Sequence, residues 1–387
     1  MDALTTPLPK AWQKVRLGDI AEIKRGVRIT KNELDVFGKY PVVSGGVGFL
    51  GYTNNFNRYE NTITIAQYGT AGYVNFQKNK FWANDVCFCV YPNKDVIKNI
   101  FLYYFLKVNQ NYLYEISNRN ATPYSISKDK ILDFEILLPP LNEQIAIANI
   151  LSDVDRYLYS LDALILKKES VKKALSFELL SQRKRLKGFN QNWQKVRLGT
   201  YKYRRGSFPQ PYGNPQWYSD NGMPFVQVYD VGENFKLNQK TKQKISKIAQ
   251  PMSVFVPKNS VIITLQGTID RVALTQYDCY CDRTILIFDN NTLNDVNKYF
   301  FVLSLFTKFE EEKRKADGSI IKTITKQTLK DFEIPLPPLN EQIAIANILS
   351  DVDSEIISLK NKKRQFENIK KALNHDLMSA KIRVLKK

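Results

Sequence analysis

Two segments of the chain carry apolar residues at alternating spacings of four and three positions. The first segment has them at Ile147, Leu151, Val154, Leu158, Leu161 and Ile165, and again at Leu175 and Leu179 after Lys168 and Lys172. The second has them at Ile345, Leu349, Val352, Ile356, Leu359, Phe366, Leu373 and Leu377. Such a heptad seam is typical of a long helix that pairs with another helix. We therefore expect the two helices to pair with each other; the alternative is that each packs on its own domain.

The first long helix is predicted to begin at Asn142. Pro139 and Pro140 close the strand-like run ILLPP, because proline supplies no backbone donor and disfavours helical angles in the residue before it. Asn142 is a suitable N-cap, and Glu143 places a negative charge in the first turn, where the helix dipole favours it. No proline or glycine occurs from Asn142 to Lys187, so the helix can run for roughly 45 residues, on the order of 65 Å.

The start of each predicted helix lies in an identical repeat. The eighteen residues LPPLNEQIAIANILSDVD occur from Leu138 and again from Leu336, an offset of 198 positions. The sequences DFEI before them and KKAL after them recur at the same offset, whereas WQKVRLG recurs at Trp12 and Trp193, an offset of 181. The region between these anchors is therefore 17 residues longer in the second half. Two large units with shared ends and dissimilar middles indicate duplicated modules rather than a solenoid.

The segments follow the order variable domain, long helix, variable domain, long helix. We place the first domain at residues 1–138, the first helix at 139–188, the second domain at 189–336 and the second helix at 337–387. The expected fold class is α+β, with two α/β domains separated by two long helices that form an antiparallel coiled coil with pseudo-twofold symmetry. Duplex DNA has local twofold axes, and proteins of this symmetry read paired half-sites at a fixed spacing.

The charge of the chain favours a polyanionic partner. Lys and Arg total 57 against 38 Asp and Glu, a formal excess of +19 with a pI near 9.5. The alternative is a basic protein that is merely soluble. The start MDALTTPLPKAWQKV has no apolar signal-peptide core, and no run reaches about 18 consecutive apolar residues. We expect a cytoplasmic protein with no membrane attachment.

The four cysteines form two C-x-C pairs, Cys87 with Cys89 and Cys279 with Cys281. Zinc sites usually use C-x2-C or a wider spacing, and these pairs fall in different halves of the chain. We interpret them as reduced thiols in strands and expect no metal site.

Short matches to enzyme motifs are weak. Gly46, Gly48 and Gly51 form G-x-G-x-x-G, but the turn-like YTNNFN follows where a dinucleotide or methyl-donor site needs a helix N-terminus. NPQW at Asn214 is similar to the N-P-P-Y motif of amino-methyltransferases, yet no donor-binding strand, loop and helix accompany it, so a loop is expected. No phosphate-binding loop is present, and the single histidine, His375, lies on the second helix among basic residues.

The paired pattern LPPL.EQ followed by a heptad helix, each time after a divergent domain, resembles the specificity subunits of type I restriction-modification enzymes. The resemblance covers nearly the whole chain. The segments YPVVSGGVGFLGYT and ITIAQYGTAGYVNF in the first domain, and MPFVQVYDVGEN and VIITLQGTIDRVAL in the second, look like target-recognition domains. The second domain departs from the usual opening, because GSFPQPYGNPQWY stands where G-G-T-P-S is common. This departure leaves its target class open.

The resemblance implies a non-catalytic subunit. Each target-recognition domain would read one half of a split site in double-stranded DNA, and the helices would set the gap and dock two methyltransferase subunits. S-adenosylmethionine, ATP and magnesium would belong to those subunits and to restriction and translocase subunits, so no cofactor is expected in this chain. The expected docking residues are Asn142, Glu143, Gln144, Asn340, Glu341 and Gln342. The alternatives are a stand-alone adenine DNA methyltransferase and a DNA-binding scaffold without sequence preference.

Candidate DNA-binding residues are amide, hydroxyl, aromatic and cationic side chains in polar, turn-rich segments, because such groups reach base edges and phosphates. In the first domain they are Gln67, Tyr68, Thr70, Lys78, Lys80, Arg119, Asn120 and Tyr124. In the second they are Gln227, Tyr229, Asn234, Gln266, Thr268, Arg271, Lys313, Arg314 and Lys315. The basic run QRKRLK from Gln182 to Lys187 is a further candidate for phosphate contact, although positive charge also suits a helix C-terminus.

Overall fold

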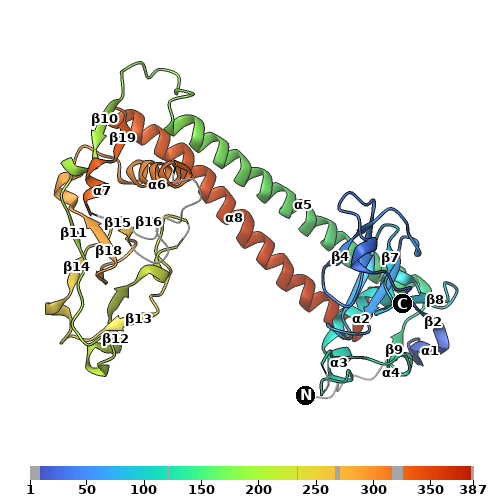
Figure 1. Ribbon diagram of the computed structural model, residues 1–387. Helices are drawn as coiled ribbons and strands as arrows, with labels where there is room; N and C mark the ends of the chain where they lie inside the picture. Colours follow the sequence, from blue (N-terminus) through green and yellow to red (C-terminus); the bar gives the residue numbers. More distant parts are fainter. Residues whose placement is uncertain (1–8, 121, 233, 266–270, 316–325, 385–387) are drawn as a thin grey trace. The chain divides into compact units, whose positions relative to one another are not determined.

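The computed structural model describes residues 9–120, 122–232, 234–265, 271–315 and 326–384, apart from the side chains of Lys315 and Lys326. The chain divides into two compact units (Figure 1). One unit is Met1–Leu164 with Leu359–Lys387, and the other is Ile165–Ser358. The boundaries fall inside the two long helices, so each unit holds one globular domain and a part of each helix.

The described residues of the first domain form three sheets. The largest has the strand order β2 (Ala21–Arg25), β8 (Cys87–Pro92), β5 (Thr62–Ala66) and β6 (Val74–Gln77), all antiparallel. The second sheet joins β4 (Phe49–Thr53), β3 (Tyr40–Val43) and β7 (Trp82–Ala83), and β1 (Gln13–Arg16) pairs with β9 (Glu135–Leu138). The helical segments are α1 (Leu17–Ile20), η1 (Lys31–Glu33), α2 (Asn99–Val108), α3 (Gln110–Glu115) and α4 (Lys128–Leu132).

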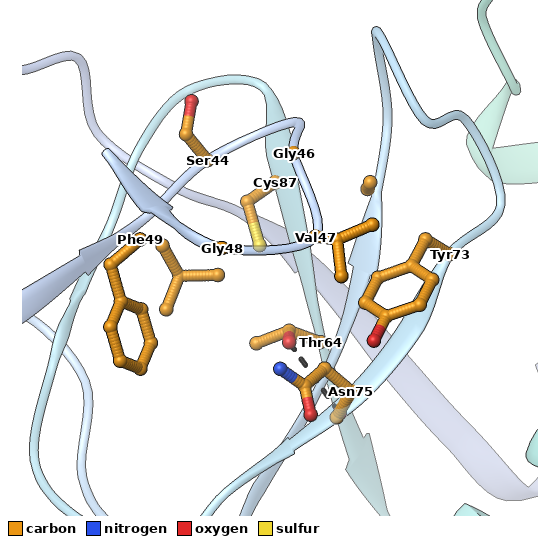
Figure 2. Close-up of a pocket in the computed structure, with 11 residues that line it drawn as sticks. Ser44, Gly46, Val47, Gly48, Phe49, Thr64, Tyr73, Asn75 and Cys87 are labelled. Carbon is orange, nitrogen blue, oxygen red and sulfur yellow. Dashed lines mark hydrogen bonds between the residues drawn. The ribbon is translucent and has the colours of Figure 1, made fainter. Parts of the chain in front are cut away.

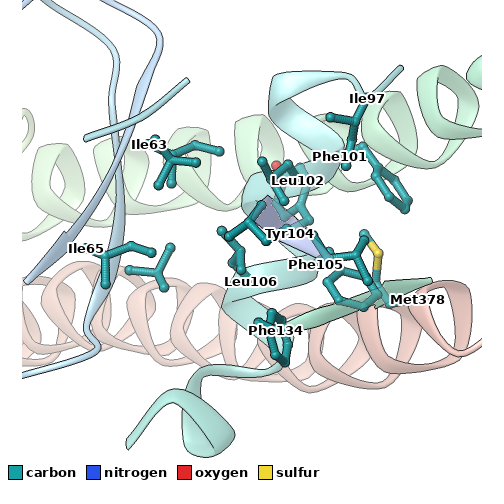
Figure 3. Packing of buried hydrophobic residues seen from close by; sticks show 14 of the residues in the cluster. Ile63, Ile65, Ile97, Phe101, Leu102, Tyr104, Phe105, Leu106, Phe134 and Met378 are labelled. Carbon is teal, nitrogen blue, oxygen red and sulfur yellow. The ribbon is translucent and has the colours of Figure 1, made fainter. Parts of the chain in front are cut away.

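The core of the first domain lies between its largest sheet and α2. The central strand β5 has the sequence TITIA, which is rich in β-branched residues, and all five residues are buried. Figure 3 shows Ile63 and Ile65 of this strand with Phe101 and Phe105 of α2 in one hydrophobic cluster. Met378, from the end of the second long helix, belongs to the same cluster. The domain core is therefore continuous with the helix pair.

The second domain repeats this plan with longer loops. One sheet has the strand order β11 (Tyr203–Arg205), β18 (Ile285–Phe288), β15 (Val261–Thr264) and β16 (Val272–Leu274). Another has the order β13 (Gln243–Ile245), β12 (Tyr218–Val226), β17 (Cys279–Cys281) and β14 (Val254–Val256). In a third, β10 (Gln194–Arg197) pairs with β19 (Glu333–Leu336). The helical segments are η2 (Leu198–Thr200), η3 (Pro215–Trp217), η4 (Val228–Asp230), η5 (Gln250–Met252), η6 (Asn290–Thr292), α6 (Lys298–Lys315) and α7 (Lys326–Asp331). The duplicated-module interpretation of the sequence is thus confirmed at the level of topology.

The long helices are α5 (Leu141–Leu180) and α8 (Leu339–Met378), each of 40 residues. Within each unit, α5 and α8 lie against each other in antiparallel directions, as the heptad seams predicted. In the first unit the rings of Tyr157 and Phe366 have centroids 4.6 Å apart. The sequence allowed the first helix to run to Lys187, but α5 ends at Leu180. The chain leaves the helix there because Gln182 adopts a left-handed φ of 61°.

The alternative interpretation, that each helix packs on its own domain, also describes part of the structure. Ile147 and Leu151, near the start of α5, are buried in the core of the first domain. Leu377, at the end of α8, belongs to that same core. In the second unit the start of α8 and the end of α5 share the second domain's core, through Ile345, Leu349, Leu179 and Leu180. Each domain therefore holds the start of one helix and the end of the other.

The segments with enzyme-like motifs have ordinary structural roles. Gly46, Gly48 and Gly51 lie in and after the turn between β3 and β4, and the strand β4 follows instead of a helix. Asn214 caps the short helix η3 by accepting a hydrogen bond from the backbone N–H of Gln216 at 3.0 Å. The four cysteines are free and buried. Over the described residues, no group of three or more His, Cys, Asp or Glu side chains is placed to hold a metal, and no helix is long and apolar enough to cross a membrane.

Candidate nucleic-acid interface

Three loops of the first domain are joined along one edge of its sheets. The backbone N–H groups of Thr70, Gly69 and Ile126 donate to the carbonyl oxygens of Gly45, Tyr124 and Gln67, at 2.8, 3.0 and 2.9 Å. These bonds connect the loop after β3, the loop after β5 and the segment before α4. We call residues 44–48, 67–73 and 118–126 (without 121) the first loop edge. Because the bonds are between backbones, they fix the loops while leaving side chains free to contact a ligand.

Arg119 is the cationic residue of the first loop edge. Its guanidinium lies 5.1 Å from the ring centroid of Tyr114 and 5.0 Å from that of Tyr124. Its Nε donates to the carbonyl oxygen of Tyr114 at 2.9 Å. The two rings orient the guanidinium through cation–π contacts. Since Tyr124 is 43% exposed, the pair presents a flat cationic surface that suits phosphates and base edges.

A glycine-rich turn covers the inner side of this edge. Figure 2 shows the Gly46–Phe49 turn above Thr64 and Asn75, which come from β5 and β6. None of the 11 residues that line this small pocket is charged. A side chain at Gly45 would lie 2.2 Å from the carbonyl oxygen of Tyr68. Glycine is therefore needed at this position for the two loops to meet.

The structure brings six of the eight candidate residues of the first domain to the first loop edge. They are Gln67, Tyr68, Thr70, Arg119, Asn120 and Tyr124. Lys78 and Lys80 lie elsewhere, because they follow β6 at the end of the β5–β6 hairpin opposite to the loop after β5. Lys80 contacts the rings of Phe56 and Tyr59 there, at 4.6 and 5.4 Å from their centroids. The two lysines thus form a separate group from the loop edge.

The second domain has an equivalent edge, formed by residues 227–232 and 234–242 together with Arg271. We call it the second loop edge. The carboxylate of Asp230, which is 1% exposed, accepts the backbone N–H groups of Gln227 and Lys242, each at 2.9 Å. Burial raises the pKa of this carboxyl, although the two N–H donors offset part of the effect. Arg271, directly before β16, donates from Nη1 to the carbonyl oxygen of Val231 at 2.7 Å, in the loop after β12.

The exposed side chains of the second loop edge are polar and cationic. Tyr229 is 46% exposed, its hydroxyl donates to Oε1 of Gln227, and the ammonium of Lys242 lies 5.0 Å from its ring centroid. Lys242 was not among the predicted DNA-binding residues, although it lies in the polar run QKTKQK. Its backbone N–H is held by the buried carboxylate of Asp230. The edge therefore offers an amide, a phenol and an ammonium group side by side, which are the groups that read bases and hold phosphates.

The remaining candidates of the second domain are divided between this edge, α6 and the residues that the structure leaves undescribed. Gln227, Tyr229, Asn234 and Arg271 belong to the second loop edge. Gln266 and Thr268 lie outside the described residues, as does the side chain of Lys315. Lys313 and Arg314 lie in the last turn of α6, where the former pairs with Glu310 at 3.3 Å and the latter donates to the Glu310 carbonyl oxygen at 3.2 Å.

The identical segment anchors each domain to the helices through a buried glutamate. Glu143 is 2% exposed and accepts hydrogen bonds from Trp12 Nε1 at 3.1 Å and from Arg383 Nε and Nη2 at 2.6 and 3.1 Å. In the second unit, Glu341 is 0% exposed and accepts from Trp193 Nε1 at 3.0 Å and from Arg185 Nη2 and Nε at 2.7 and 3.3 Å. We call these two groups the first and second clasp. The arginines recur at the repeat offset, which is the sequence signal that identifies them.

The neighbouring glutamine ties each helix start to the domain helix. Gln144 accepts the backbone N–H of Lys98 at 2.8 Å, just before α2, and donates to the carbonyl oxygen of Pro139 at 2.8 Å. Gln342 likewise accepts the backbone N–H of Asn297 at 2.9 Å, just before α6. Both glutamines are buried, and their side chains satisfy backbone groups at the starts of α2 and α6.

These contacts divide the six expected docking residues into two groups. Glu143, Gln144, Glu341 and Gln342 are buried in intramolecular contacts, whereas Asn142 and Asn340 are exposed. Four exposed positions at each helix start are spaced by three and four residues and share one helix face. They are Asn142, Ile145, Asn149 and Asp153 on α5, and Asn340, Ile343, Asn347 and Asp351 on α8. The two isoleucines are 44% and 41% exposed.

Comparison with known proteins gives one consistent result. The model of the type I restriction modification DNA specificity domain matches residues 9–173 and again 190–368. The putative type I restriction enzyme MjaX specificity subunit of Methanocaldococcus jannaschii is 30% identical over 305 residues, which cover 76% of this chain and 70% of the relative. The MjaVIII specificity subunit of the same organism is 25% identical and covers 97% and 94% of the two chains. The crystal structure of a type I restriction-modification S subunit from M. genitalium superposes with a TM-score of 0.68 at 19% identity, covering 97% of each chain.

Proposed function

This chain belongs to the family of type I restriction-modification DNA specificity subunits, and we propose that its two domains each read one half of a split sequence in double-stranded DNA. It is a non-catalytic specificity subunit with two target-recognition domains. The observation that carries the proposal is the pair of loop edges. In each domain, loops from separate strands are joined by hydrogen bonds into one surface that bears amide, aromatic and cationic side chains.

The chemistry of the edges suits sequence readout in the major groove. Amides and guanidinium groups form paired hydrogen bonds with purine edges, and hydroxyl and ammonium groups hold phosphates. The first edge presents Arg119 and Tyr124, and the second presents Gln227, Tyr229 and Lys242. Since the two edges have different side chains, the two half-sites should have different sequences.

The exposed face of the identical segment supports docking of two copies of one methyltransferase subunit. Both helix starts present the same residues in the same order, with an exposed isoleucine between two asparagines. One partner surface can therefore bind at both places, and a half-exposed isoleucine gains by being covered. In this proposal S-adenosylmethionine, ATP and magnesium are held by the methyltransferase and by restriction and translocase subunits.

The test is selection from a duplex library. Purified protein assembled with its methyltransferase partner is mixed with random duplexes at moderate salt, and bound duplexes are sequenced. We expect a consensus of two specified blocks separated by an unspecified gap of constant length. Bound duplexes with no shared sequence, or with a single uninterrupted block, would contradict the proposal.

A further inference from the structure

The apolar seam between the long helices is interrupted by lysines. The heptad positions between the apolar residues of α5 are occupied by Lys168 and Lys172, and those of α8 by Lys363 and Lys370. Their side chains are only 33%, 23%, 31% and 28% exposed. A charged group at a seam position lowers the stability of a helix pair, and its usual benefit is to specify one arrangement.

Each seam lysine meets a carboxylate on the other helix. In the second unit Lys168 lies 2.8 Å from Glu355 and Lys172 lies 2.5 Å from Asp353. In the first unit Lys363 lies 2.6 Å from Asp162, and Lys370 pairs with Asp155. In this alignment all four lysines therefore have a carboxylate of the opposite helix as partner, and Lys363 also lies 3.6 Å from Glu367 of its own helix.

Two of these carboxylates are also bound by the globular domains. Asp155 accepts the hydroxyl of Tyr104 at 2.7 Å, and Asp353 accepts the hydroxyl of Tyr299 at 2.5 Å. Each aspartate thus connects a domain, the helix that follows it and the seam lysine of the opposite helix. The two clasps repeat this arrangement at the helix starts, where a tryptophan of the domain and an arginine beyond the opposite helix meet one glutamate.

A heptad seam alone permits other alignments. Apolar contact is not directional, so sliding one helix by seven residues, about 10 Å, still places apolar side chains against each other. The lysines oppose such a slide in both directions. Lys172 now faces Asp353. A slide of seven residues in one direction would place Lys172 opposite Lys360, a like charge, and a slide in the other direction would place it opposite Ala346, which offers no partner. Both clasps would also break and leave buried carboxylates uncompensated.

We propose that the seam lysines and the two clasps together restrict α5 and α8 to a single antiparallel register, and that this register determines which gap between half-sites the protein accepts. The second part rests on the proposed function. A slide of about 10 Å corresponds to about three base pairs of duplex, so loss of the register should appear as tolerance of gaps that differ by about this number.

The variants replace charges by groups that need no partner. The seam variant carries K168L, K172L, K363L and K370L. The clasp variant carries R185M, E341Q, R383M and E143Q, so that each arginine is removed together with the charge of its glutamate. The combined variant carries all eight substitutions. A control variant carries K167L, K173L, K362L and K371L, which change the exposed lysine next to each seam lysine.

The first readout needs no DNA and reports the register directly. Engineered cysteines at Tyr157 and Phe366, whose rings are in contact, should crosslink on oxidation in every variant that keeps the native register. Leu359 and Leu373 lie one heptad before and after Phe366. A cysteine at Tyr157 combined with a cysteine at Leu359 therefore reports a slide in one direction, and the combination with Leu373 reports a slide in the other. We expect the shifted pairs to crosslink at least tenfold more in the combined variant than in the wild-type or control background. The native cysteines are buried in strands and should not compete.

The second readout is the ratio of affinities for duplexes with the native gap and with gaps changed by about three base pairs. This ratio should fall at least fivefold in the combined variant, while the half-site sequences stay the same. A merely stabilising role for the lysines and clasps predicts that the combined variant loses thermal stability while its crosslinks and its ratio of affinities stay as in the wild type.

A single register in the combined variant overturns the proposal. Shifted crosslinks with an unchanged gap ratio overturn its second part. If the wild-type protein selects no split sequence, the proposed function fails, while the crosslinks still decide the first part.

Discussion

Among single residues, carboxylates of the same helix segment have opposite roles ten positions apart. Glu143 and Glu341 are held inside the protein by a tryptophan and an arginine, whereas Asp153 and Asp351, ten residues further along the same identical segment, are exposed. The difference follows from the helix face on which each residue lies. A buried carboxylate requires its partners, because an unpaired buried charge is far more costly than an unpaired exposed one.

Arg185→Met should therefore destabilise the second unit by about 3 kcal/mol, since it leaves the carboxylate of Glu341 buried without its counter-ion. Arg183→Met, which changes an exposed arginine two positions away, should alter the free energy of unfolding by less than about 0.5 kcal/mol. Adding Glu341→Gln to Arg185→Met should recover most of the loss. Chemical denaturation gives the three values, and equal losses for Arg185→Met and Arg183→Met would contradict the clasp.

The two tyrosines that bind the seam aspartates predict a dependence on alkaline pH. Burial, reinforced by the hydrogen bond to an aspartate, raises the pKa of Tyr104 and Tyr299 above the ordinary value of 10.0. A raised folded-state pKa means that their contribution to stability is complete below pH 10.0 and is lost as the pH rises through the folded-state value.

The free-energy difference between the wild type and the double variant Y104F, Y299F should thus be constant from about pH 7 to about pH 9 and shrink above about pH 10. Tyr159→Phe, at an exposed position, is the control and should give no such change. Unfolding measured across this range decides the matter, and a pH-independent difference would count against the tyrosine–aspartate contacts.

At the scale of elements, the long helices could be predicted because their apolar positions repeat over many turns. The grouping of the loops could not, because it depends on hydrogen bonds such as that between Ile126 and Gln67, whose positions are far apart in the chain. The burial of Glu143 could not be predicted either, because its partner Arg383 lies 240 positions away in the chain. In addition, the polar residues at the start of the helix differ only in the helix face on which they lie. The same limitation explains why Lys78 was grouped with Gln67, from which the hairpin separates it.

The exposed face of each helix start predicts the stoichiometry of docking. Ile145→Asp should remove one docked methyltransferase and Ile343→Asp the other, because a charge at the centre of a covered apolar contact is costly. Each single variant should bind one copy, and the double variant none. Ile369→Asp, at an isoleucine that is 51% exposed on α8 outside the identical segment, is the control. Native mass spectrometry counts the copies, and two bound copies in both single variants would refute this surface.

At the scale of the whole molecule, the excess of +19 charges should make DNA binding strongly dependent on salt. If at least about four phosphates are neutralised, the slope of log affinity against log salt should be about −3.6 or steeper. Replacing Lys242 by alanine should reduce the magnitude of the slope by about one without changing the sequence preference, since a phosphate contact carries no base information. Fluorescence anisotropy at several salt concentrations gives the slope, and a magnitude of about one or less would contradict a grip by two domains.

Changing one loop edge at a time and determining the recognised sequence by duplex selection shows whether each domain reads its own half-site. The first variant carries R119A and Y124A, and the second carries Y229A and R271A, so that each alters one edge and leaves the other intact. We predict that each variant loses base preference in one block only, a different block for each, while the other block and the gap remain as in the wild type. Loss of preference in both blocks from a single edge, or an unchanged consensus in both variants, would contradict the claim that each domain reads its own half-site.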